Sequence, residues 1–208
     1  MYLVTISRMY GSGGSDVAAR VAEALGWTLY DNAVVDGVAA RLGLTRAEVS
    51  ERDERIPSMA ERLAATMTMS APEMMPPVPR RPTPTPEQQV VEATRRVIED
   101  AVRQGPAVFV GRGAQCLLAS RPDALHVFCY APKELLARYL VEHRGVAAAD
   151  AERQVTEMNR QREAYVRRNW NRSWRDFDNY HLCLNTGWLG VERAAELVVA
   201  AVRGRERA

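Results

Sequence analysis

The sequence predicts an α/β fold in which a parallel sheet is flanked by helices, and three observations support that prediction. First, short apolar runs alternate along the 208 residues with longer segments whose apolar residues recur at i, i+3, i+4 and i+7, the period of a helix. Second, the runs 107–110 (AVFV) and 125–130 (LHVFCY) are almost entirely apolar, as strands buried on both faces are. Third, this order of strands and helices is typical of right-handed βαβ units.

Local signals bound the expected elements. The β-branched run from Tyr2 to Ser7 ends at a cluster of glycines, and the amphipathic segment from Asp16 to Leu25 follows that cluster. A later helix has Pro86 in its first turn and ends before Gly105. In chain order we expect strands at 2–7, 27–30, 107–110, 125–130 and 181–185, and helices at 16–25, 34–42, 86–104, 132–143, 148–170 and 191–203.

The stretch Ala71–Pro86 interrupts this alternation with seven prolines. Proline at such density is incompatible with a helix or a central strand and favours extended chain. Two interpretations follow: a mobile surface linker, or a flap or docking arm over a substrate site. Composition does not separate them.

Charge and cysteine usage exclude several classes of protein. The sum of 28 basic and 26 acidic residues is +2, which gives no reason to expect nucleic acid or an acidic membrane as a partner. No apolar run approaches the ~18 residues of a membrane span. The three cysteines are far apart and lie inside apolar runs, which indicates reduced core residues and a cytoplasmic protein. The three histidines show no zinc-site spacing.

A glycine-rich turn separates the first expected strand from the first helix. Such a turn exposes backbone N–H groups beside a helix N-terminus, which favours a phosphate group. In the pattern G-x-x-x-x-G-K-[ST], Gly13 matches the second glycine and Ser15 the hydroxyl that binds Mg²⁺, whereas Arg8 and Gly14 replace the first glycine and the lysine. A plain strand–helix turn is the alternative. The candidate donor-phosphate residues are Gly11, Ser12, Gly13, Gly14 and Ser15.

The missing lysine has one obvious substitute in the sequence. Lys133 is the only lysine, and it follows a later strand, far from the loop. Arg8 can fold over the loop that it precedes, and its planar fork suits two phosphate oxygens. We therefore expect Arg8 to neutralise charge at the donor phosphates, the alternative being an arginine that points to solvent or pairs with an acid.

Two further polar residues follow expected strands, where ligands of parallel sheets bind. Asp31 follows the run 27–30, and its alternative role is to cap the helix after it. Arg112 stands between two glycines after the run 107–110, where it is placed to hold a phosphate through two hydrogen bonds. A solvated arginine in a tight turn is the alternative there.

The expected helix 148–170 carries a group of basic residues near its end. Arg160, Arg167 and Arg168 share one helix face, and Arg162 and Tyr165 are neighbours at i, i+3. This pattern predicts an anion-binding stripe. A solvated face is one alternative; RNA binding, with Trp170 and Trp174 as stacking groups, is another, which the near-neutral net charge argues against.

Taken together, these motifs resemble the cytidylate kinase-like family of P-loop kinases. The residues that carry the resemblance are Thr5–Arg8 with Gly11–Ser15, Val110–Gly113, Asn179–Thr186 and Leu189–Glu192. The resemblance implies one domain over 1–208 with a five-stranded parallel sheet, an acceptor-binding arm at 33–104 and a lid at 148–178. It implies phosphoryl transfer from ATP with Mg²⁺ to a small phosphorylated acceptor, a nucleoside monophosphate with CMP first.

The resemblance also assigns roles to residues. Gly11–Ser15 would hold the donor triphosphate, with Ser15 on Mg²⁺, and Arg162 and Arg168 would clamp the transferring phosphoryl group. Arg8, from the argument on the missing lysine, and Arg112 complete the expected catalytic set. The acceptor set would be Asp31, Arg112, Arg160 and Tyr165. Asn159 stands where the lid pattern has an acid. A kinase for another small molecule, and a nucleotide-binding regulator without turnover, are the alternative functions.

Overall fold

The computed structural model describes residues 3–45, 47–49 and 85–205. In chain order these residues form β1 (Leu3–Arg8), α1 (Gly14–Leu25), β2 (Thr28–Tyr30), α2 (Asn32–Leu42), α5 (Pro86–Gln104), β3 (Ala107–Val110), α6 (Ala114–Leu117), β4 (Ala124–Tyr130), α7 (Lys133–Arg144), α8 (Ala148–Trp170), the 3₁₀ turn η1 (Phe177–Asn179), β5 (Leu182–Asn185) and α9 (Thr186–Arg205).

The strands form one parallel sheet in the order β2-β3-β1-β4-β5. The central strand is β1, whose residues Leu3–Ile6 pair with β3 and Leu3–Arg8 with β4. Because the strands are parallel, their carboxyl ends meet at one edge, and both the glycine loop after β1 and the Gly111–Gly113 turn after β3 lie at that edge. The predicted five-stranded parallel sheet is therefore confirmed.

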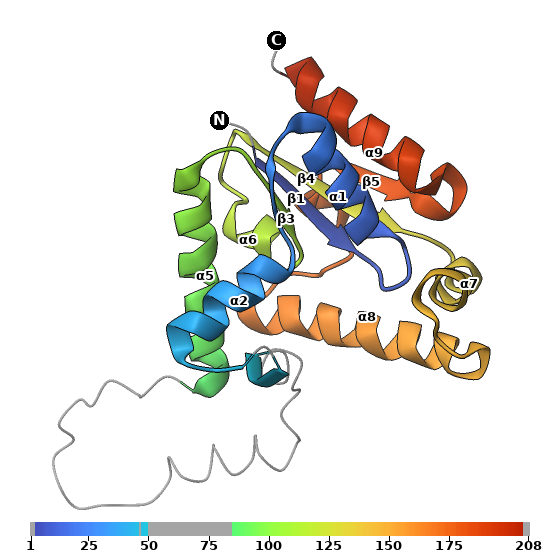
Figure 1. Ribbon diagram of the computed structural model, residues 1–208, viewed down its shortest axis with the longest axis horizontal. Coiled ribbons are helices and arrows are strands. Elements are labelled where there is room, and N and C mark those ends of the chain that lie inside the picture. Colours follow the sequence, from blue (N-terminus) through green and yellow to red (C-terminus); the bar gives the residue numbers. More distant parts are fainter. Residues whose placement is uncertain (1–2, 46, 50–84, 206–208) are drawn as a thin grey trace, which may run out of the picture.

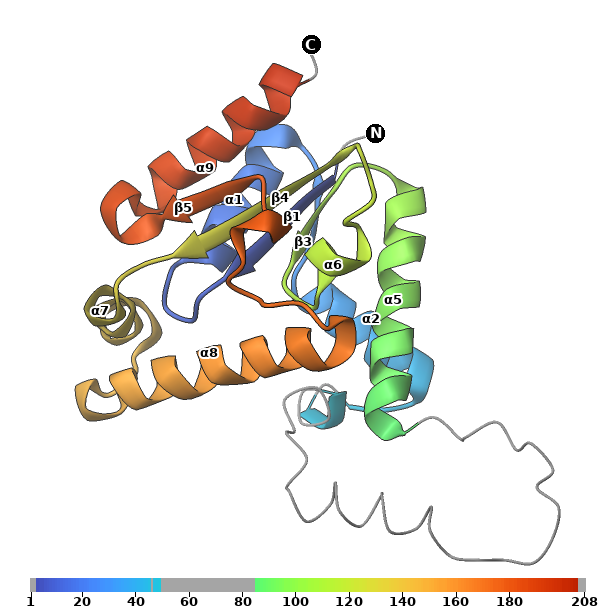
Figure 2. The same ribbon diagram turned by 180° about the vertical axis from the view of Figure 1, so that it is seen from behind.

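Helices cover both faces of the sheet (Figures 1 and 2). Helices α1 and α9 pack on one face, where Val17 and Val198 join the strand residues Val4 and Ile6 in a buried core. On the other face α2, α5 and α6 pack around Phe109. The residues of β3 and most of those of β4 are buried whichever face they point to, which explains why these two runs are almost entirely apolar rather than alternating.

Several expected boundaries are confirmed to the residue, namely 86–104, 107–110 and 148–170. Helix α5 starts at Pro86 because Thr85 and Gln88 form a reciprocal capping box. Helix α9 begins at Thr186, earlier than the expected 191, since a helical turn precedes a kink at Gly190 (φ 75°, ψ 167°). The four-residue helix α6 was not predicted. Of the stretch 71–86, only Thr85 and Pro86 are among the described residues, so both interpretations of that stretch stay predictions.

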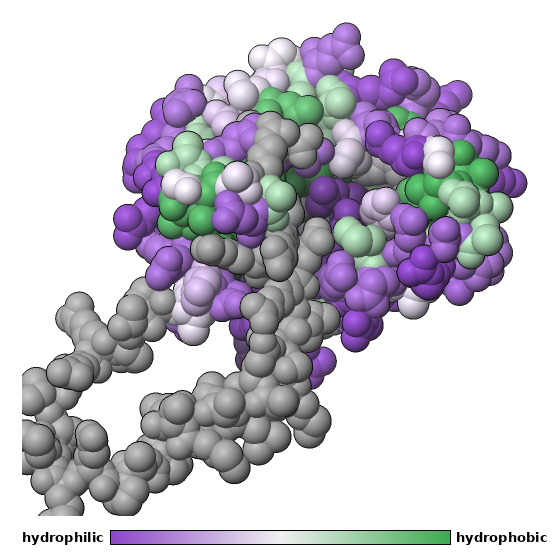
Figure 3. Space-filling model, turned by 60° about the horizontal axis from the view of Figure 1, so that its bottom comes forward, coloured by the Kyte–Doolittle hydropathy of each residue, from purple (hydrophilic) through white to green (hydrophobic). Residues whose placement is uncertain are grey.

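Helix α8 crosses beneath the edge at which the strands end (Figure 1). It packs on α7 through Ala151 and Val155, and near its other end Val166 lies in a cluster with Phe128 and Trp174. The side of the molecule that Figure 3 brings forward is largely hydrophilic, with hydrophobic residues gathered in separate patches. Among the described helices, none is long and apolar enough to cross a membrane.

Candidate active site

The loop between β1 and α1 has the geometry of a phosphate-binding turn. Gly11 and Gly13 adopt φ of 83° and 67°, and a Cβ on Gly11 would collide with the carbonyl of Leu136. The Ser12 hydroxyl donates to the Met9 carbonyl at 2.8 Å, which closes the turn. Since α1 starts at Gly14, the N–H groups of Gly14 and Ser15 have no intrahelical acceptors, whereas those of Asp16 and Val17 bond to the Gly13 carbonyl.

The turn after β3 holds Arg112 in a rare backbone conformation. Arg112 has φ 53° and lies between two glycines with φ 68°. A Cβ on Gly111 would collide with the Arg8 guanidinium, and a Cβ on Gly113 would collide with the indole ring of Trp170. Both glycines thus combine a left-handed backbone with a close neighbour, and backbone strain such as that at Arg112 is typical of functional sites.

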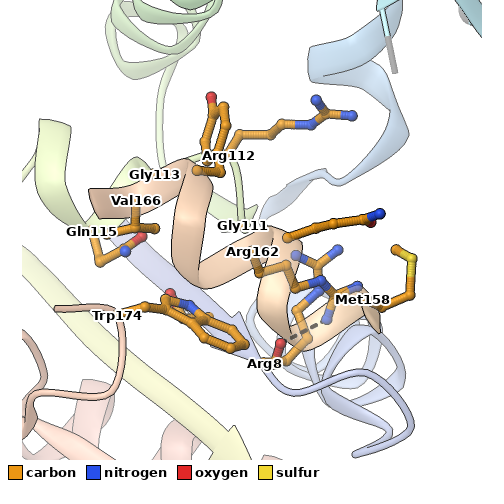
Figure 4. A pocket seen from close by; sticks show the side chains of 12 residues that line it. Arg8, Gly111, Arg112, Gly113, Gln115, Met158, Arg162, Val166 and Trp174 are labelled. Atoms are coloured by element: carbon orange, nitrogen blue, oxygen red, sulfur yellow. Dashed lines mark hydrogen bonds between the residues drawn. The ribbon is translucent and has the colours of Figure 1, made fainter. Parts of the chain in front are cut away.

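A cavity of about 130 Å³ lies between this turn, the end of β1 and α8. Figure 4 shows Arg8 and Arg162 close together in it, with Arg112 extending from the β3 turn and Trp174 at the opposite wall. Burial lowers the pKa of Arg8, the Asp31 carboxylate opposes this, and Arg112 adds to it; burial lowers the pKa of Arg112 as well. Guanidinium groups crowded in this way favour an anion between them. We name this space the arginine cavity.

Three buried polar atoms in the wall of the arginine cavity have no hydrogen-bond partner within the described residues. They are Arg8 Nε, Tyr165 OH and Gln161 Oε1. Burial raises the pKa of Tyr165 to about 12, so its hydroxyl stays protonated and able to donate at neutral pH. Since unpaired buried polar atoms are unfavourable, two such donors and one acceptor on residues that line one cavity favour a polar ligand there.

Helix α8 docks directly on the glycine loop. The Asn159 side-chain oxygen, buried beneath the loop, accepts the Tyr10 N–H at 2.7 Å, and Arg162 Nη1 donates to the Arg8 carbonyl at 2.7 Å. The Arg162 guanidinium also lies 5.5 Å from the centre of the Tyr10 ring. Asn159 thus supplies a neutral acceptor that ties helix α8 to the loop.

A second cavity, of about 630 Å³, runs along the glycine loop itself and is named the loop cavity. Gly11, Gly13, Gly14 and Ser15 line it, as do Asp16 and Asp31. Arg8 and Arg162 line both the loop cavity and the arginine cavity, so the two spaces meet at these guanidinium groups. A third cavity, of about 600 Å³, lies beyond the loop between α7 and the start of α9; Ser12 lines it.

Asp31 belongs to the loop cavity and not to a helix cap. It occupies the N-cap position of α2 but its side chain makes no capping hydrogen bond. Instead its Oδ1 lies 3.8 Å from Arg8 Nη2. The structure therefore favours the sequence-based placement of Asp31 in the crevice over the capping alternative, and it places Arg8 beside an acid.

The arginine stripe predicted on α8 is divided between two faces. Arg162 and Tyr165 face the arginine cavity, whereas Arg160 is exposed and pairs with Glu157 at 2.9 Å. Arg168 is exposed as well and lines none of these three cavities.

Lys133 pairs with Glu152 at 2.9 Å and also lies outside the cavities. Residues that the motifs missed are Gln115, Gln161 and Trp174 in the arginine cavity, and Asp16, Tyr139 and Arg144 around the loop.

The loop cavity offers oxygen ligands of the kind that Mg²⁺ takes in kinases. Ser15 and Asp31 line it, although no group of three or more His, Cys, Asp or Glu side chains among the described residues forms a metal cage. Magnesium at nucleotides usually keeps waters and substrate phosphate oxygens as most of its ligands. The residues present therefore fit the ion.

This sheet order, with a glycine loop after the first strand and a helix across the carboxyl edge, defines the class of P-loop kinases. Within that class, the chain belongs to the cytidylate kinase-like family, whose model matches residues 3–187. No match was found among the curated proteins.

Solved structures share the whole fold at low sequence identity. An uncharacterized protein from Eubacterium ventriosum is 20% identical with a TM-score of 0.70, over 98% of this chain and 99% of that one. Shikimate kinase from Acinetobacter baumannii is 12% identical with a TM-score of 0.54 (99% and 94%), and shikimate kinase from Bacteroides thetaiotaomicron is 13% identical with 0.53 (97% and 98%). At these identities the likeness shows the fold alone.

Proposed function

We propose that the protein transfers a phosphoryl group from ATP to a nucleoside monophosphate, with CMP as the first candidate. The observation that supports this best is that Arg8 and Arg162 line both the loop cavity and the arginine cavity. Two phosphate groups bound on either side of these guanidinium groups would meet at them. Phosphoryl transfer needs such positioning and charge neutralisation more than it needs a protein nucleophile.

In this proposal the two cavities have separate roles. The donor triphosphate lies along Gly11–Ser15, and the acceptor phosphate lies in the arginine cavity between Arg112 and Tyr165. Arg8 and Arg162 hold the transferring group through charge-assisted hydrogen bonds. Mg²⁺ on Ser15 supplies further charge neutralisation when bound.

Helix α8 closes the site in the same proposal. The hydrogen bond that the Asn159 side-chain oxygen accepts from the Tyr10 N–H fixes the lid against the loop, which positions Arg162 and excludes water from the reacting groups. We assign residues 148–178 to the lid and 33–104 to the acceptor arm of a single domain. The acceptor set is then Asp31, Arg112 and Tyr165, with Arg160 and Arg168 left at the surface.

The acceptor is tested by the release of ADP from ATP and Mg²⁺ over a panel of CMP, dCMP, UMP, AMP, GMP and shikimate. Acceleration by a nucleoside monophosphate supports the proposal, and the phosphorylated product identifies the acceptor. Acceleration only by a molecule without phosphate would contradict the assignment of the arginine cavity.

One observation favours a second candidate, a nucleotide-binding regulator without turnover: Gly14 stands where P-loop enzymes carry lysine. The same panel decides between them. Tight binding of ATP with no transfer to any acceptor supports the regulator and contradicts the kinase.

A further inference from the structure

Helix α7 brings a cation to the glycine loop that lies outside every motif. Arg144, the last residue of α7, lines both the loop cavity and the third cavity beyond the loop. Its Nη2 lies 3.1 Å from each carboxylate oxygen of Asp16. Asp16 follows Ser15 in the first turn of α1, so the Arg144 guanidinium is held beside the loop.

A second residue of α7 fixes the same carboxylate. A Cβ on Gly13 would lie only 3.2 Å from the Tyr139 ring, so this ring packs on the bare loop backbone. The Tyr139 hydroxyl donates a hydrogen bond to Oδ2 of Asp16, the carboxylate that Arg144 also contacts. Burial, and then the Asp16 carboxylate, raise the pKa of Tyr139 to about 12, so the phenol remains a donor at neutral pH. Asp16 is therefore bound from two sides by α7.

This arrangement resolves an electrostatic conflict. A carboxylate one residue after Ser15 would repel a polyphosphate if its charge stood alone. With Tyr139 and Arg144 bound to it, Asp16 acts instead as a positioning residue for the guanidinium. Both hydrogen bonds from Arg144 to Asp16 use Nη2, so this carboxylate does not occupy the N–H groups on Nε and Nη1, which can bind a ligand.

The other cations of the loop cavity lie at its opposite end. Arg8 and Arg162 border the arginine cavity, and Arg8 faces Asp31 there. No lysine exists near the loop, since Gly14 replaces it and Lys133 pairs with Glu152. Arg20 lines the third cavity, where it pairs with Glu192 at 2.6 Å, but it does not line the loop cavity. Among the described lining residues, Arg144 is therefore the arginine that lines both the loop cavity and the third cavity.

We propose that Arg144 binds the polyphosphate of the donor nucleotide and, on that side of the loop, takes the place of the absent lysine. The inference rests on the proposed kinase function. In this proposal Arg8 and Arg162 hold the phosphoryl group that is transferred, while Arg144 holds the phosphate groups that remain on the donor nucleotide after transfer. Arg144 then contributes mainly to the binding of ATP, ADP and inorganic tripolyphosphate.

The test compares three variants by calorimetric titration of ATP, tripolyphosphate and adenosine in the presence of Mg²⁺. Arg144→Ala should weaken ATP and tripolyphosphate by about tenfold to a hundredfold, as expected for lost hydrogen bonds to a charged group, and leave adenosine unchanged. Arg144→Lys should recover part of the affinity, because it keeps the charge without the fork. Arg138→Ala is the matched control: this arginine lies on the same helix, pairs with Glu142 at 3.9 Å and lines none of the three cavities.

The outcomes separate the inference from the function on which it rests. If the wild-type protein binds ATP and transfers phosphoryl groups but Arg144→Ala behaves as Arg138→Ala does, the role of Arg144 is overturned and the kinase stands. Equal losses for adenosine and ATP would also overturn it, because they would indicate a damaged fold. If the wild-type protein binds neither ATP nor tripolyphosphate, both proposals fail.

Discussion

The Cβ of Arg8 occupies the space that a side chain on Gly14 would need, so the end of β1 and the start of α1 exclude each other's side chains. In the P-loop pattern these two positions carry glycine and lysine, in that order. Here the arginine stands at the first and the glycine at the second. The two departures are therefore linked: the cation stands at position 8 instead of position 14, and with a side chain at position 8 there is no space for one at position 14.

The exchange makes a prediction about coupled substitutions. Gly14→Lys, which restores the lysine of the pattern, should lower the free energy of unfolding by about 1–3 kcal/mol, because a Cβ at position 14 meets Arg8 and Cys129. Removing the obstructing side chain as well, in Arg8→Gly/Gly14→Lys, should recover much of that loss. Urea denaturation of both single variants and the double variant measures the coupling.

Gly204→Ala is the control for this cycle, since nothing lies within 4 Å of a Cβ at that helical position. It should be neutral or slightly stabilising. Strictly additive effects of the two substitutions at positions 8 and 14 would show that the side chains do not compete.

A second prediction concerns catalysis by Arg8. Arg8→Ala should reduce kcat by ~10²–10³, the usual effect of losing one preorganised charge-stabilising donor, and should change KM for the acceptor far less. Arg8→Lys should restore only part of the rate. Steady-state kinetics with ATP and the best acceptor measure both effects, and Arg153→Ala, an exposed arginine of α8 paired with Asp150, serves as control. A wild-type kcat/KM for ATP in Arg8→Ala would contradict the role.

The sequence was sufficient for the sheet and for the loop because their signals are local. Apolar runs and glycine clusters lie within a few residues of one another, and they located the five strands. They placed the ends of the glycine loop within two residues, since β1 ends at Arg8 rather than 7 and α1 begins at Gly14 rather than 16. Helix α6 was missed because four residues after a turn are too short for a helical period. The first turn of α9 was missed because Thr186 continues the strand without a break.

The orientation of the arginines on α8 was readable in principle. Ala151, Val155, Asn159 and Val166 recur at helical spacing and are the buried residues of that helix. Arg162 and Tyr165 lie beside this buried line, whereas Arg160 lies off it. A sequence-based prediction centred on the apolar residues, and not on the charges, would have separated the two faces.

The contacts around the loop could not be predicted in the same way. Asp16 and Arg144 are 128 positions apart, and Tyr10 and Asn159 are 149 apart. Neither pair follows from any local pattern. These contacts depend on the packing of α7 and α8 under the sheet edge, which only the tertiary structure provides.

Ser15→Ala should weaken the Mg²⁺-dependent part of ATP binding and leave the fold intact. The hydroxyl lines the loop cavity and would be one ligand of the ion. The measurement is the ratio of ATP affinities with and without Mg²⁺. Ser12→Ala is the comparison, because that hydroxyl donates to Met9 within the loop, so its loss should lower stability but keep the Mg²⁺ ratio. An unchanged ratio in Ser15→Ala would remove Ser15 from the metal site.

Stability should fall in mild acid because of His126. Burial, then the neighbouring His181, lower the pKa of His126 from 6.5 to about 4. The folded state thus favours the neutral ring, and this contribution, at most about 3 kcal/mol, is present above pH 6.5 and is lost as the pH falls toward 4. Thermal melting from pH 7 to 4 measures it. His126→Gln should flatten the profile, while His143→Gln, on an exposed part of α7, should not; equal slopes in the two variants would contradict this origin.

Tyr165→Phe should separate ligand binding from stability. Its hydroxyl is buried without a hydrogen-bond partner within the described residues, so removing it from the free protein should leave the free energy of unfolding unchanged or slightly higher. If the acceptor phosphate lies in the arginine cavity, the same change should weaken acceptor binding by about tenfold, the value of a hydrogen bond to a charged group. Tyr180→Phe is the comparison: its hydroxyl donates to the Trp174 carbonyl at 2.8 Å, and Tyr180 itself does not line the arginine cavity, so the change should lower stability by about 1 kcal/mol and leave acceptor binding unchanged. Chemical denaturation and acceptor titration of both variants give four numbers. The assignment of Tyr165 to the acceptor site holds only if the two losses fall on opposite variants.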